Sequence, residues 1–189
     1  MTEEMWKTTT PLAEKYREKL LTDIYNEVVK CRNKKGKFPS VNNRKDQTVS
    51  GKRPKSIFFG KRPNTRATRN LYPNEPNYRG NLYYPKVYKL LTEYHDKFHK
   101  DHKYTVILVN RSVQFLKHKD KGNVEGSVNL IVGTGNYTGG ELTLFDEEDI
   151  YNYPKTIDIR YKPLFFNPFQ YHQVEPFEGD RVTITYYST

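Results

Sequence analysis

The sequence predicts a mainly β protein, a jelly roll of two antiparallel sheets with support helices ahead of the strands. From Tyr104 onward, eight short β-branched or aromatic runs follow one another with no helical period between them. Glycine, asparagine, aspartate and proline separate the runs, as expected for sheets joined by turns. The first 103 residues contain two segments with helical spacing, and helices placed before the strands are expected to cover one sheet from outside.

A length of 189 residues suits one domain with a substantial core. We expect a helical and basic part (1–103) packed on a β core (104–189). The single cysteine, Cys31, excludes an internal disulfide and fits a reducing compartment. The first residues lack the pattern of a signal peptide, and no apolar run approaches membrane-spanning length, which predicts an intracellular protein, nuclear or cytoplasmic.

The first helix is predicted to begin at Thr10-Pro11, where a hydroxyl residue precedes proline at the first helical position. Apolar residues then recur every four positions and form one face of a helix. These residues are Leu12, Tyr16, Leu20, Ile24 and Val28. We interpret this helix as a support packed against a sheet.

Between the two helices lies a strongly basic segment, 30–69, with 14 Lys and Arg against one acid, Asp46, a net charge of +13. The remaining 18 basic and 21 acidic residues give the rest of the chain −3, so the total of +10 resides in this segment. Such a block indicates a polyanion-binding surface, although a solvated loop without a partner is the alternative. Within it, Ser56–Gly60 is an apolar strand candidate, and Arg62 and Arg66 on the following loop suit phosphate contact.

A second helix is predicted from Pro85, with Val87, Leu91 and Phe98 on its apolar stripe. Three histidines gather at its end: His95, His99 and His102. No carboxylate or cysteine completes a metal site with them, so we expect a structural or surface role. The strands then follow at 104–109, 113–117, 127–132, 141–145, 156–161, 164–166, 171–174 and 181–187.

Three side chains among these strands are of the types that ligate iron. His118 and Asp120 stand two residues apart at the end of the second predicted strand, so both face the same side of an extended chain. His172 lies on the seventh predicted strand. Two imidazoles and a carboxylate form the facial triad that holds Fe(II) and leaves positions open for co-substrate and oxygen. The alternative is a surface loop at 118–120 and a core histidine at 172.

Arg181 begins the eighth predicted strand, adjacent to the strand of His172. Its guanidinium is suited to bind the distal carboxylate of 2-oxoglutarate with two hydrogen bonds. Thr183, two residues along on the same face, can add a hydroxyl to that carboxylate.

On these residues, the region Tyr104–Thr189 resembles the Fe(II)/2-oxoglutarate-dependent dioxygenases, whose jelly roll is called a double-stranded β-helix. The stretch YTGGEL at 137–142 is similar to the turn and strand that many members carry between the two histidines. The resemblance implies His118, Asp120 and His172 as iron ligands and Arg181 as the 2-oxoglutarate contact. It also implies an enzyme that uses Fe(II), 2-oxoglutarate and O2, and that oxidises a substrate C–H bond while forming succinate.

Within this family the motifs are most similar to the TET/JBP branch, which oxidises the methyl group of 5-methylpyrimidines in DNA. The longer pattern H-x-D-x-x-N is present with Asn123 as its last residue, and the strand from Arg181 to Tyr187 resembles the branch's R-x-S-x-x-x-Y strand. The resemblance implies that Asn123 contacts the target base and that Tyr187 stacks on it once flipped. The chain departs from the animal TET enzymes in a shorter interval between His172 and Arg181 and in lacking a cysteine-rich zinc-binding region.

Three functions follow from the sequence. The first is oxidation of a methylated pyrimidine (5-methylcytosine or thymine type) in nucleic acid, DNA more than RNA. The second is hydroxylation of a protein, as in prolyl hydroxylases, although those enzymes usually place a lysine where Arg181 stands. The third is a non-catalytic nucleic-acid-binding β-sandwich. AlkB-like demethylases are another branch, but the paired-arginine motif at their C-terminal end is not matched.

Overall fold

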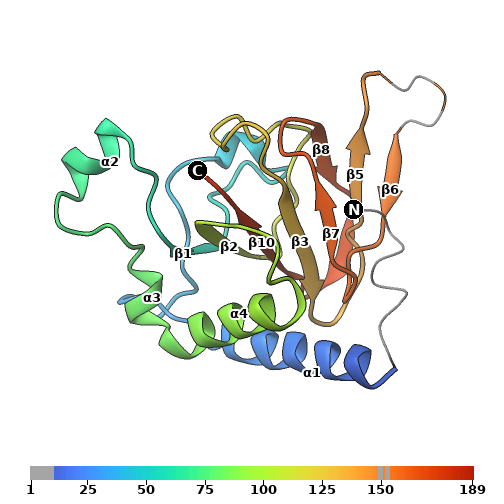
Figure 1. Ribbon diagram of the computed structural model, residues 1–189, viewed down its shortest axis with the longest axis horizontal. Helices are drawn as coiled ribbons and strands as arrows, with labels where there is room; N and C mark the ends of the chain where they lie inside the picture. The colour runs from blue at the N-terminus through green and yellow to red at the C-terminus, as the bar shows by residue number, and fades with distance from the viewer. Residues whose placement is uncertain (1–10, 149–150, 152–153) are drawn as a thin grey trace.

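The computed structural model describes residues 11–148, 151 and 154–189, so the predicted cap Thr10 lies outside the described residues. The predicted jelly roll is confirmed, with helices beneath one sheet (Figure 1). The helical elements are α1 (Pro11–Val28), η1 (Lys45–Gln47), α2 (Arg66–Leu71), α3 (Gly80–Tyr83) and α4 (Pro85–Phe98). Among these described helices, none combines the length and apolar character needed to cross a bilayer.

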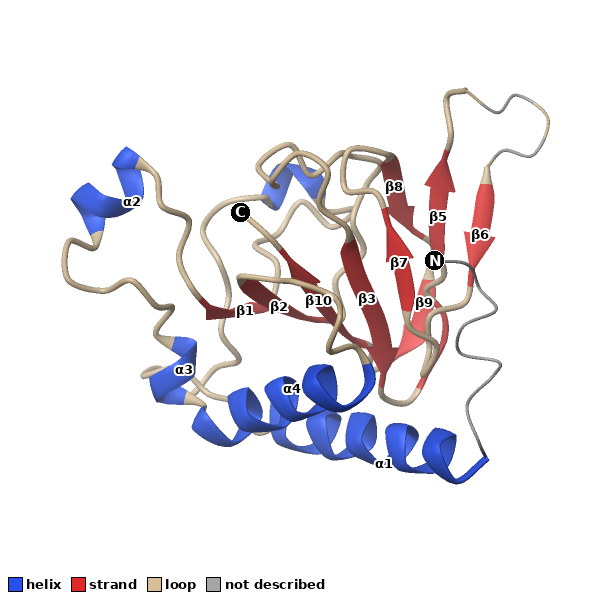
Figure 2. Cartoon of the chain, in the orientation of Figure 1, coloured by secondary structure: helices blue, strands red, loops and turns tan. Residues whose placement is uncertain are grey.

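The described strands form three antiparallel sheets (Figure 2). The large sheet has the order β1 (Ser56–Gly60), β2 (Val106–Arg111), β10 (Val182–Tyr187), β3 (Asn129–Thr134) and β7 (Leu164–Phe166). A second sheet has the order β6 (Lys155–Ile157), β5 (Leu142–Phe145) and β8 (Tyr171–Val174), and β4 (Tyr137–Gly139) pairs with β9 (Phe177–Gly179). Because β1 comes from the basic N-terminal part, the large sheet joins both parts of the chain.

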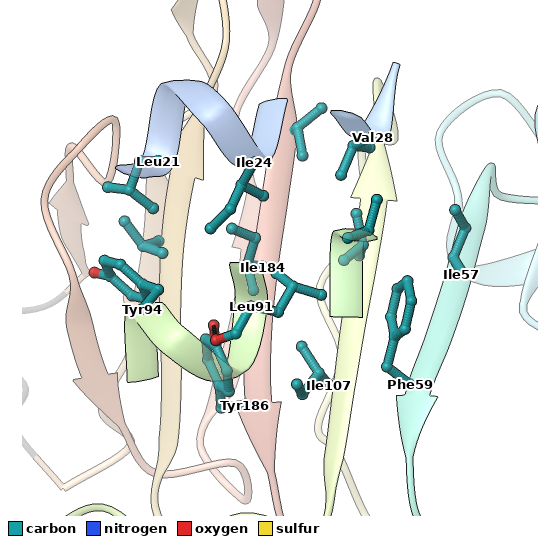
Figure 3. Packing of buried hydrophobic residues seen from close by; sticks show 14 of the residues in the cluster. Leu21, Ile24, Val28, Ile57, Phe59, Leu91, Tyr94, Ile107, Ile184 and Tyr186 are labelled. Carbon is teal, nitrogen blue, oxygen red and sulfur yellow. Dashed lines mark hydrogen bonds between the residues drawn. The ribbon is translucent and has the colours of Figure 1, made fainter. Parts of the chain in front are cut away.

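The main core lies between the large sheet and the pair of helices α1 and α4 (Figure 3). Leu21 and Ile24 of α1 and Leu91 of α4 are fully buried against strand residues such as Ile107 and Ile184. Burial of each aliphatic side chain stabilises the fold by roughly 1.5–3 kcal/mol. This packing shows why the apolar stripe of α1 extends over several turns. The first residue of the stripe, Leu12, is not packed in the core and is 80% exposed.

The two faces of the large sheet have different roles because successive side chains on a strand point to opposite sides. On β10, Ile184 and Tyr186 belong to the core under the helices. Thr183 and Tyr187 lie on the other face, where they line a cavity. One strand therefore connects the helical core to the candidate site.

Several strand predictions were wrong in detail. The segment 113–117 forms no strand; Phe115 pairs only with Thr48 in a single bridge, and the next bridge joins His118 to His172. The cause lies in how this segment is bonded to β8. Val174 N–H donates to Phe115 C=O, and His118 pairs with His172. Between these two contacts the chain advances three residues on the 113–118 side but only two on β8. An extra residue of this kind interrupts a regular ladder.

Five short elements were not predicted from the sequence, namely β4, β9, η1, α2 and α3. The strands β4 and β9, of three residues each, are too short to stand out in a sequence. The loop after β1 contains α2, whose first turn is capped by Thr65: its hydroxyl accepts from Thr68 N–H at 3.1 Å. Figure 1 shows α2 standing away from the body of the protein.

The basic segment is folded onto the β core beside the candidate site. Its backbone pairs across the loop, with Val41 N–H donating to Pro54 C=O. Two further bonds hold the segment to the extended chain before His118: Val49 N–H donates to Gln114 C=O at 2.9 Å, and Leu116 N–H donates to Gln47 C=O at 2.7 Å. The positive charge of this segment is thus placed next to the predicted iron ligands.

The three histidines at the end of α4 are part of the interior. His95 Nε2 lies 3.1 Å from His102 Nδ1, and His102 Nε2 lies 2.6 Å from the carbonyl of Val128. Because only a protonated His102 Nε2 can satisfy that carbonyl, a neutral His102 accepts at Nδ1 and His95 donates to it. His99 Nε2 lies 3.1 Å from the hydroxyl of Tyr94. These bonds tie α4 to the loop before β3.

Candidate active site

His118, Asp120 and His172 come together at the open end of the jelly roll. His118 and His172 form an antiparallel bridge in which each backbone N–H donates to the other's carbonyl at 3.0 Å. One carboxylate oxygen of Asp120 lies 3.4 Å from His118 Nε2, and the other lies 3.6 Å from His172 Nε2. Among the described residues, these three form a group able to hold a metal ion, with their ligand atoms within 4.8 Å of one another.

Backbone carbonyls hold both imidazoles in the orientation that a metal ligand requires. His118 Nδ1 lies 2.7 Å from the carbonyl of Leu116, and His172 Nδ1 lies 2.8 Å from the carbonyl of Gln170. Each Nδ1 must carry the proton that it donates, so each Nε2 of the neutral ring keeps its lone pair. Both lone pairs face Asp120. This is the arrangement by which proteins fix the tautomer of a metal-bound histidine.

The carboxylate of Asp120 is supported by two asparagines. Asn129, buried at the start of β3, donates to Asp120 Oδ2 at 3.1 Å, and Asn123 donates to Asn129 Oδ1 at 2.8 Å. Burial alone would raise the pKa of Asp120, but the neighbouring groups His118, His172 and Arg44 outweigh it and lower that pKa. Asp120 is therefore held as an oriented carboxylate, the form that binds a cation.

The three residues line a cavity of about 620 Å³, including space open to solvent. Apolar side chains from both sheets form part of its wall: Leu108, Phe115, Ile131, Leu142, Phe166 and Val174. The strands β8 and β10 belong to different sheets, so His172 and Arg181 reach the cavity from opposite layers. The expectation that the two strands are adjacent was wrong.

Arg181 lies in the same cavity and is 2% exposed. Its Nη2 donates to the carbonyl of Gly140 at 2.8 Å, whereas its Nε has no hydrogen-bond partner in the described part of the chain. No carboxylate among the described residues forms an ion pair with this guanidinium. Burial lowers the pKa of Arg181, yet an arginine remains charged at physiological pH. A buried positive charge without a counter-ion fits a site for an anionic ligand.

The other predicted contacts divide into two groups. Thr183, Asn123 and Tyr187 line the cavity. Asn123 uses its amide N–H on Asn129, which leaves its carbonyl oxygen without a hydrogen bond among the described residues. Arg62 and Arg66 do not line the cavity. The structure thus gathers every predicted site residue except the two arginines of the loop after β1.

Arg62 is engaged in a local structure of its own. Its guanidinium lies 3.8 Å from the ring centroid of Tyr72 and pairs with Glu75 at 3.4 Å. A second aromatic ring, Tyr78, lies on its other side at 5.0 Å. Arg66 begins α2 and is exposed. These contacts give Arg62 a role in folding the loop 61–79 in addition to any surface role.

Sequence reasoning missed three polar residues of the site. Arg44 and Asn110 line the cavity, and Asn129 orients Asp120. Asn110 is buried near the end of β2 and accepts from the hydroxyl of Ser56. Asparagine inside a strand of apolar residues is a usable signal, because a buried amide needs partners. Arg44 is one of many cations in its segment, and nothing in the sequence distinguishes it.

Known proteins resemble the chain in fold. No protein-family model matches it, and no curated protein matches it. The structure of OsALKBH1 has a TM-score of 0.53 and 14% identity, over 92% of this chain and 91% of that chain. A Pseudomonas putida prolyl-4-hydroxylase has a TM-score of 0.53 and 11% identity, over 91% of this chain and 88% of that chain. At these low identities the two likenesses show a shared jelly-roll fold.

Proposed function

We propose that this protein is an Fe(II)/2-oxoglutarate-dependent dioxygenase that oxidises a methylated pyrimidine base in nucleic acid. The observation that carries the enzyme class is the meeting of two sites in one cavity: a His118–Asp120–His172 cluster and the unpaired guanidinium of Arg181. The jelly roll that the chain shares with oxygenases supports the same class.

The residues present fit the cofactor and the co-substrate. Both Nε2 atoms and the Asp120 carboxylate would hold Fe(II) on one face and leave its other positions open toward the cavity. Bound there with 2-oxoglutarate, the metal would supply oxygen activation coupled to loss of carbon dioxide. Arg181 would fix the distal carboxylate of the co-substrate, and Thr183 lies two residues along on the same cavity wall.

The substrate class is argued from charge and from two side chains. The stretch 41–54 of the basic segment is folded beside the cavity and brings Arg44 to its lining, which suits a polyanionic substrate. Tyr187 offers an aromatic ring on the cavity wall, and Asn123 offers a carbonyl oxygen that can accept from the exocyclic amine of a base. A ring for stacking and an amide for the base edge are what a flipped base requires.

A protein hydroxylase is the second candidate. It is favoured by the likeness to the prolyl-4-hydroxylase, which has the same TM-score as the likeness to OsALKBH1. In that case the basic segment would contact an acidic partner protein. The two candidates share the metal and the co-substrate, so only substrate-dependent turnover separates them.

The test is succinate formation by the anaerobically iron-loaded protein on admission of air, with methylated and unmethylated DNA compared. We expect succinate to rise with methylated DNA only, together with an oxidised base detected by mass spectrometry. The variant Asp120→Asn, which keeps the shape of the side chain but removes its charge, should form neither product. Equal succinate with both DNAs would move the search to RNA or protein substrates, and no succinate from folded, iron-bound protein would contradict the proposal.

A further inference from the structure

A second guanidinium, that of Arg44, reaches the cavity from the basic segment. Arg44 lines the same cavity as the predicted iron ligands and is partly exposed, whereas Arg181 is almost fully buried. Its charge is close to Tyr187 as well, where burial raises the pKa of the phenol and Arg44 opposes that rise. Arg44 is therefore near both the predicted oxidation site and the predicted stacking residue.

The charge of Arg44 acts on Asp120, whose pKa it helps to lower, from beyond ion-pair distance. Among the described residues, no carboxylate lies within ion-pair distance of the Arg44 guanidinium, and no hydrogen bond to its side chain is formed. Two other basic side chains near the sheet are already paired. Arg62 is bound to Glu75 and stacked on Tyr72, and Arg111 is bound to Asp180 at 2.9 Å. Arg44 thus stays free to bind a ligand anion.

The backbone holds Arg44 in a conformation that a side chain of this size rarely adopts. Its φ is 68° and its ψ is 10°, in the left-handed region. Arg44 is fixed through Gln47: Gln47 N–H donates to Arg44 C=O at 3.0 Å, and Gln47 C=O accepts from Leu116 N–H, two residues before His118. Strained residues held in this way occur preferentially at ligand sites. Arg44 is positioned relative to the iron ligands by hydrogen bonds rather than by a loose loop.

Two guanidiniums without ion-pair partners in one cavity can bind two anions. The distal carboxylate of 2-oxoglutarate can satisfy Arg181, which lies among residues of both sheets. It leaves Arg44 for an anionic group of the substrate. In a nucleic acid, a phosphate lies next to every base, and a guanidinium binds phosphate oxygens with paired hydrogen bonds.

We propose that Arg44 binds the backbone phosphate next to the oxidised base and thereby sets the position of that base in the cavity. This inference rests on the proposed function and adds a substrate-positioning residue to it. Arg44 selects a nucleotide within a strand over a free nucleoside, because only the former presents the phosphate. It carries no information about base sequence.

The experiment uses the iron- and 2-oxoglutarate-loaded protein without oxygen, so that binding is measured without turnover. Two probes are titrated calorimetrically: a single-stranded trinucleotide with a central 5-methylcytosine, and the nucleoside 5-methyldeoxycytidine. The test variant is Arg44→Asn, because asparagine tolerates the left-handed conformation. The matched control is Arg53→Asn, which removes the same charge from an exposed position of the same segment outside the cavity.

We expect Arg44→Asn to weaken trinucleotide binding about tenfold or more, as for loss of a hydrogen bond to a charged group. Arg53→Asn should change that affinity less than twofold. Nucleoside and 2-oxoglutarate affinities should stay at the wild-type value in both variants. Arg44→Lys keeps the charge but cannot form paired hydrogen bonds with a phosphate, so its trinucleotide affinity should lie between those of wild type and Arg44→Asn.

Two results would overturn the inference while leaving the oxygenase intact. In one, Arg44→Asn binds the trinucleotide with wild-type affinity, or its affinity for the nucleoside falls as much as its affinity for the trinucleotide. In the other, Arg44→Asn weakens 2-oxoglutarate instead, which would assign Arg44 to the co-substrate. Failure of the proposed function looks different: the wild-type protein itself would neither bind the trinucleotide nor form succinate with it, and that result would contradict both proposals.

Discussion

At the scale of single residues, the two arginines of the cavity are the sharpest test of its chemistry. Arg181 is buried, has an unpaired Nε and no carboxylate partner among the described residues. We expect Arg181→Gln to raise the KM for 2-oxoglutarate roughly 10- to 100-fold, since charged hydrogen bonds are lost. Metal affinity should change little, because Arg181 is not one of the three grouped ligands.

Steady-state succinate formation at varied 2-oxoglutarate checks this prediction. Activity should recover as the co-substrate concentration rises, and Arg181→Lys should retain part of the affinity because it keeps the charge. The thermal unfolding midpoint of each variant controls for damage to the buried site. A wild-type KM in a folded Arg181→Gln protein would remove Arg181 from the co-substrate site.

The residues of the site differ in how visible they are in the sequence. His118 and Asp120 are spaced as a ligand pair, and His172 and Arg181 lie on or next to predicted strands, so local sequence patterns are enough to suggest them. Arg44 and Asn129 act through their places in three dimensions. Arg44 is positioned by the bridge between Thr48 and Phe115. Asn129 has its role because it accepts from Asn123 and donates to Asp120. Such roles depend on pairing between remote segments, which one sequence does not display.

At the scale of elements, the histidine chain at the end of α4 predicts a pH dependence. Burial lowers the pKa of His95 to about 4 and that of His99 to about 3, and it lowers the pKa of His102 as well. The unfolded chain protonates His95 and His99 near pH 6.5, while the folded chain protonates these two only near pH 3–4. The folded state is therefore most favoured above pH 6.5, and each histidine costs about 1.4 kcal/mol per pH unit as the pH falls below it.

Urea unfolding between pH 7.5 and about 4.5 measures this loss. We expect His95→Gln to flatten the dependence in that window, because one titrating group is removed while a donor to His102 remains. The neighbouring rings of Tyr104 and Tyr186 do not titrate in this range, since burial raises the pKa of both. An unchanged slope in His95→Gln would show that His95 does not contribute to acid sensitivity.

The elements themselves show what periodicity can and cannot reveal. α1, α4, β7 and β8 have the predicted bounds or nearly so, because each carries its apolar pattern locally. The segment 113–117 has the composition of a strand, yet its hydrogen bonds go to a loop on one side and to irregular positions of β8 on the other. Amino-acid composition indicates a preference for the strand conformation, whereas a strand forms only where a neighbouring backbone can pair with it in regular register.

At the scale of the whole molecule, the helices and the site occupy opposite faces of one sheet. α1 and α4 bury one face of the large sheet, and the other face contributes residues to the cavity (Figure 1). A support role for the helices follows from their apolar stripes. The place of β1 in the large sheet could not be predicted in this way, because a five-residue strand in a basic loop gives no sign of the strand with which it pairs. Only the register with β2 shows that the basic part belongs to the sheet.

The same arrangement predicts how the basic segment binds nucleic acid. Lys52, Lys55, Lys61 and Arg66 are exposed on the part of the chain that flanks β1. We expect neutralising all four to glutamine to weaken binding of long DNA of any sequence about equally, because phosphate contacts carry no sequence information. The slope of log affinity against log salt should fall by up to roughly 3 to 4, since each phosphate contact releases about one counterion.

The matched control removes four exposed lysines from the helical side, namely Lys15, Lys19, Lys89 and Lys100. It changes the net charge by the same amount but leaves the segment beside the cavity intact. Fluorescence anisotropy at several salt concentrations compares the two variants with wild type. If the binding surface is the basic segment, the control keeps the wild-type slope. Equal losses in both variants would mean that DNA responds to total charge alone, and the basic segment would then have no special part in placing a strand at the cavity.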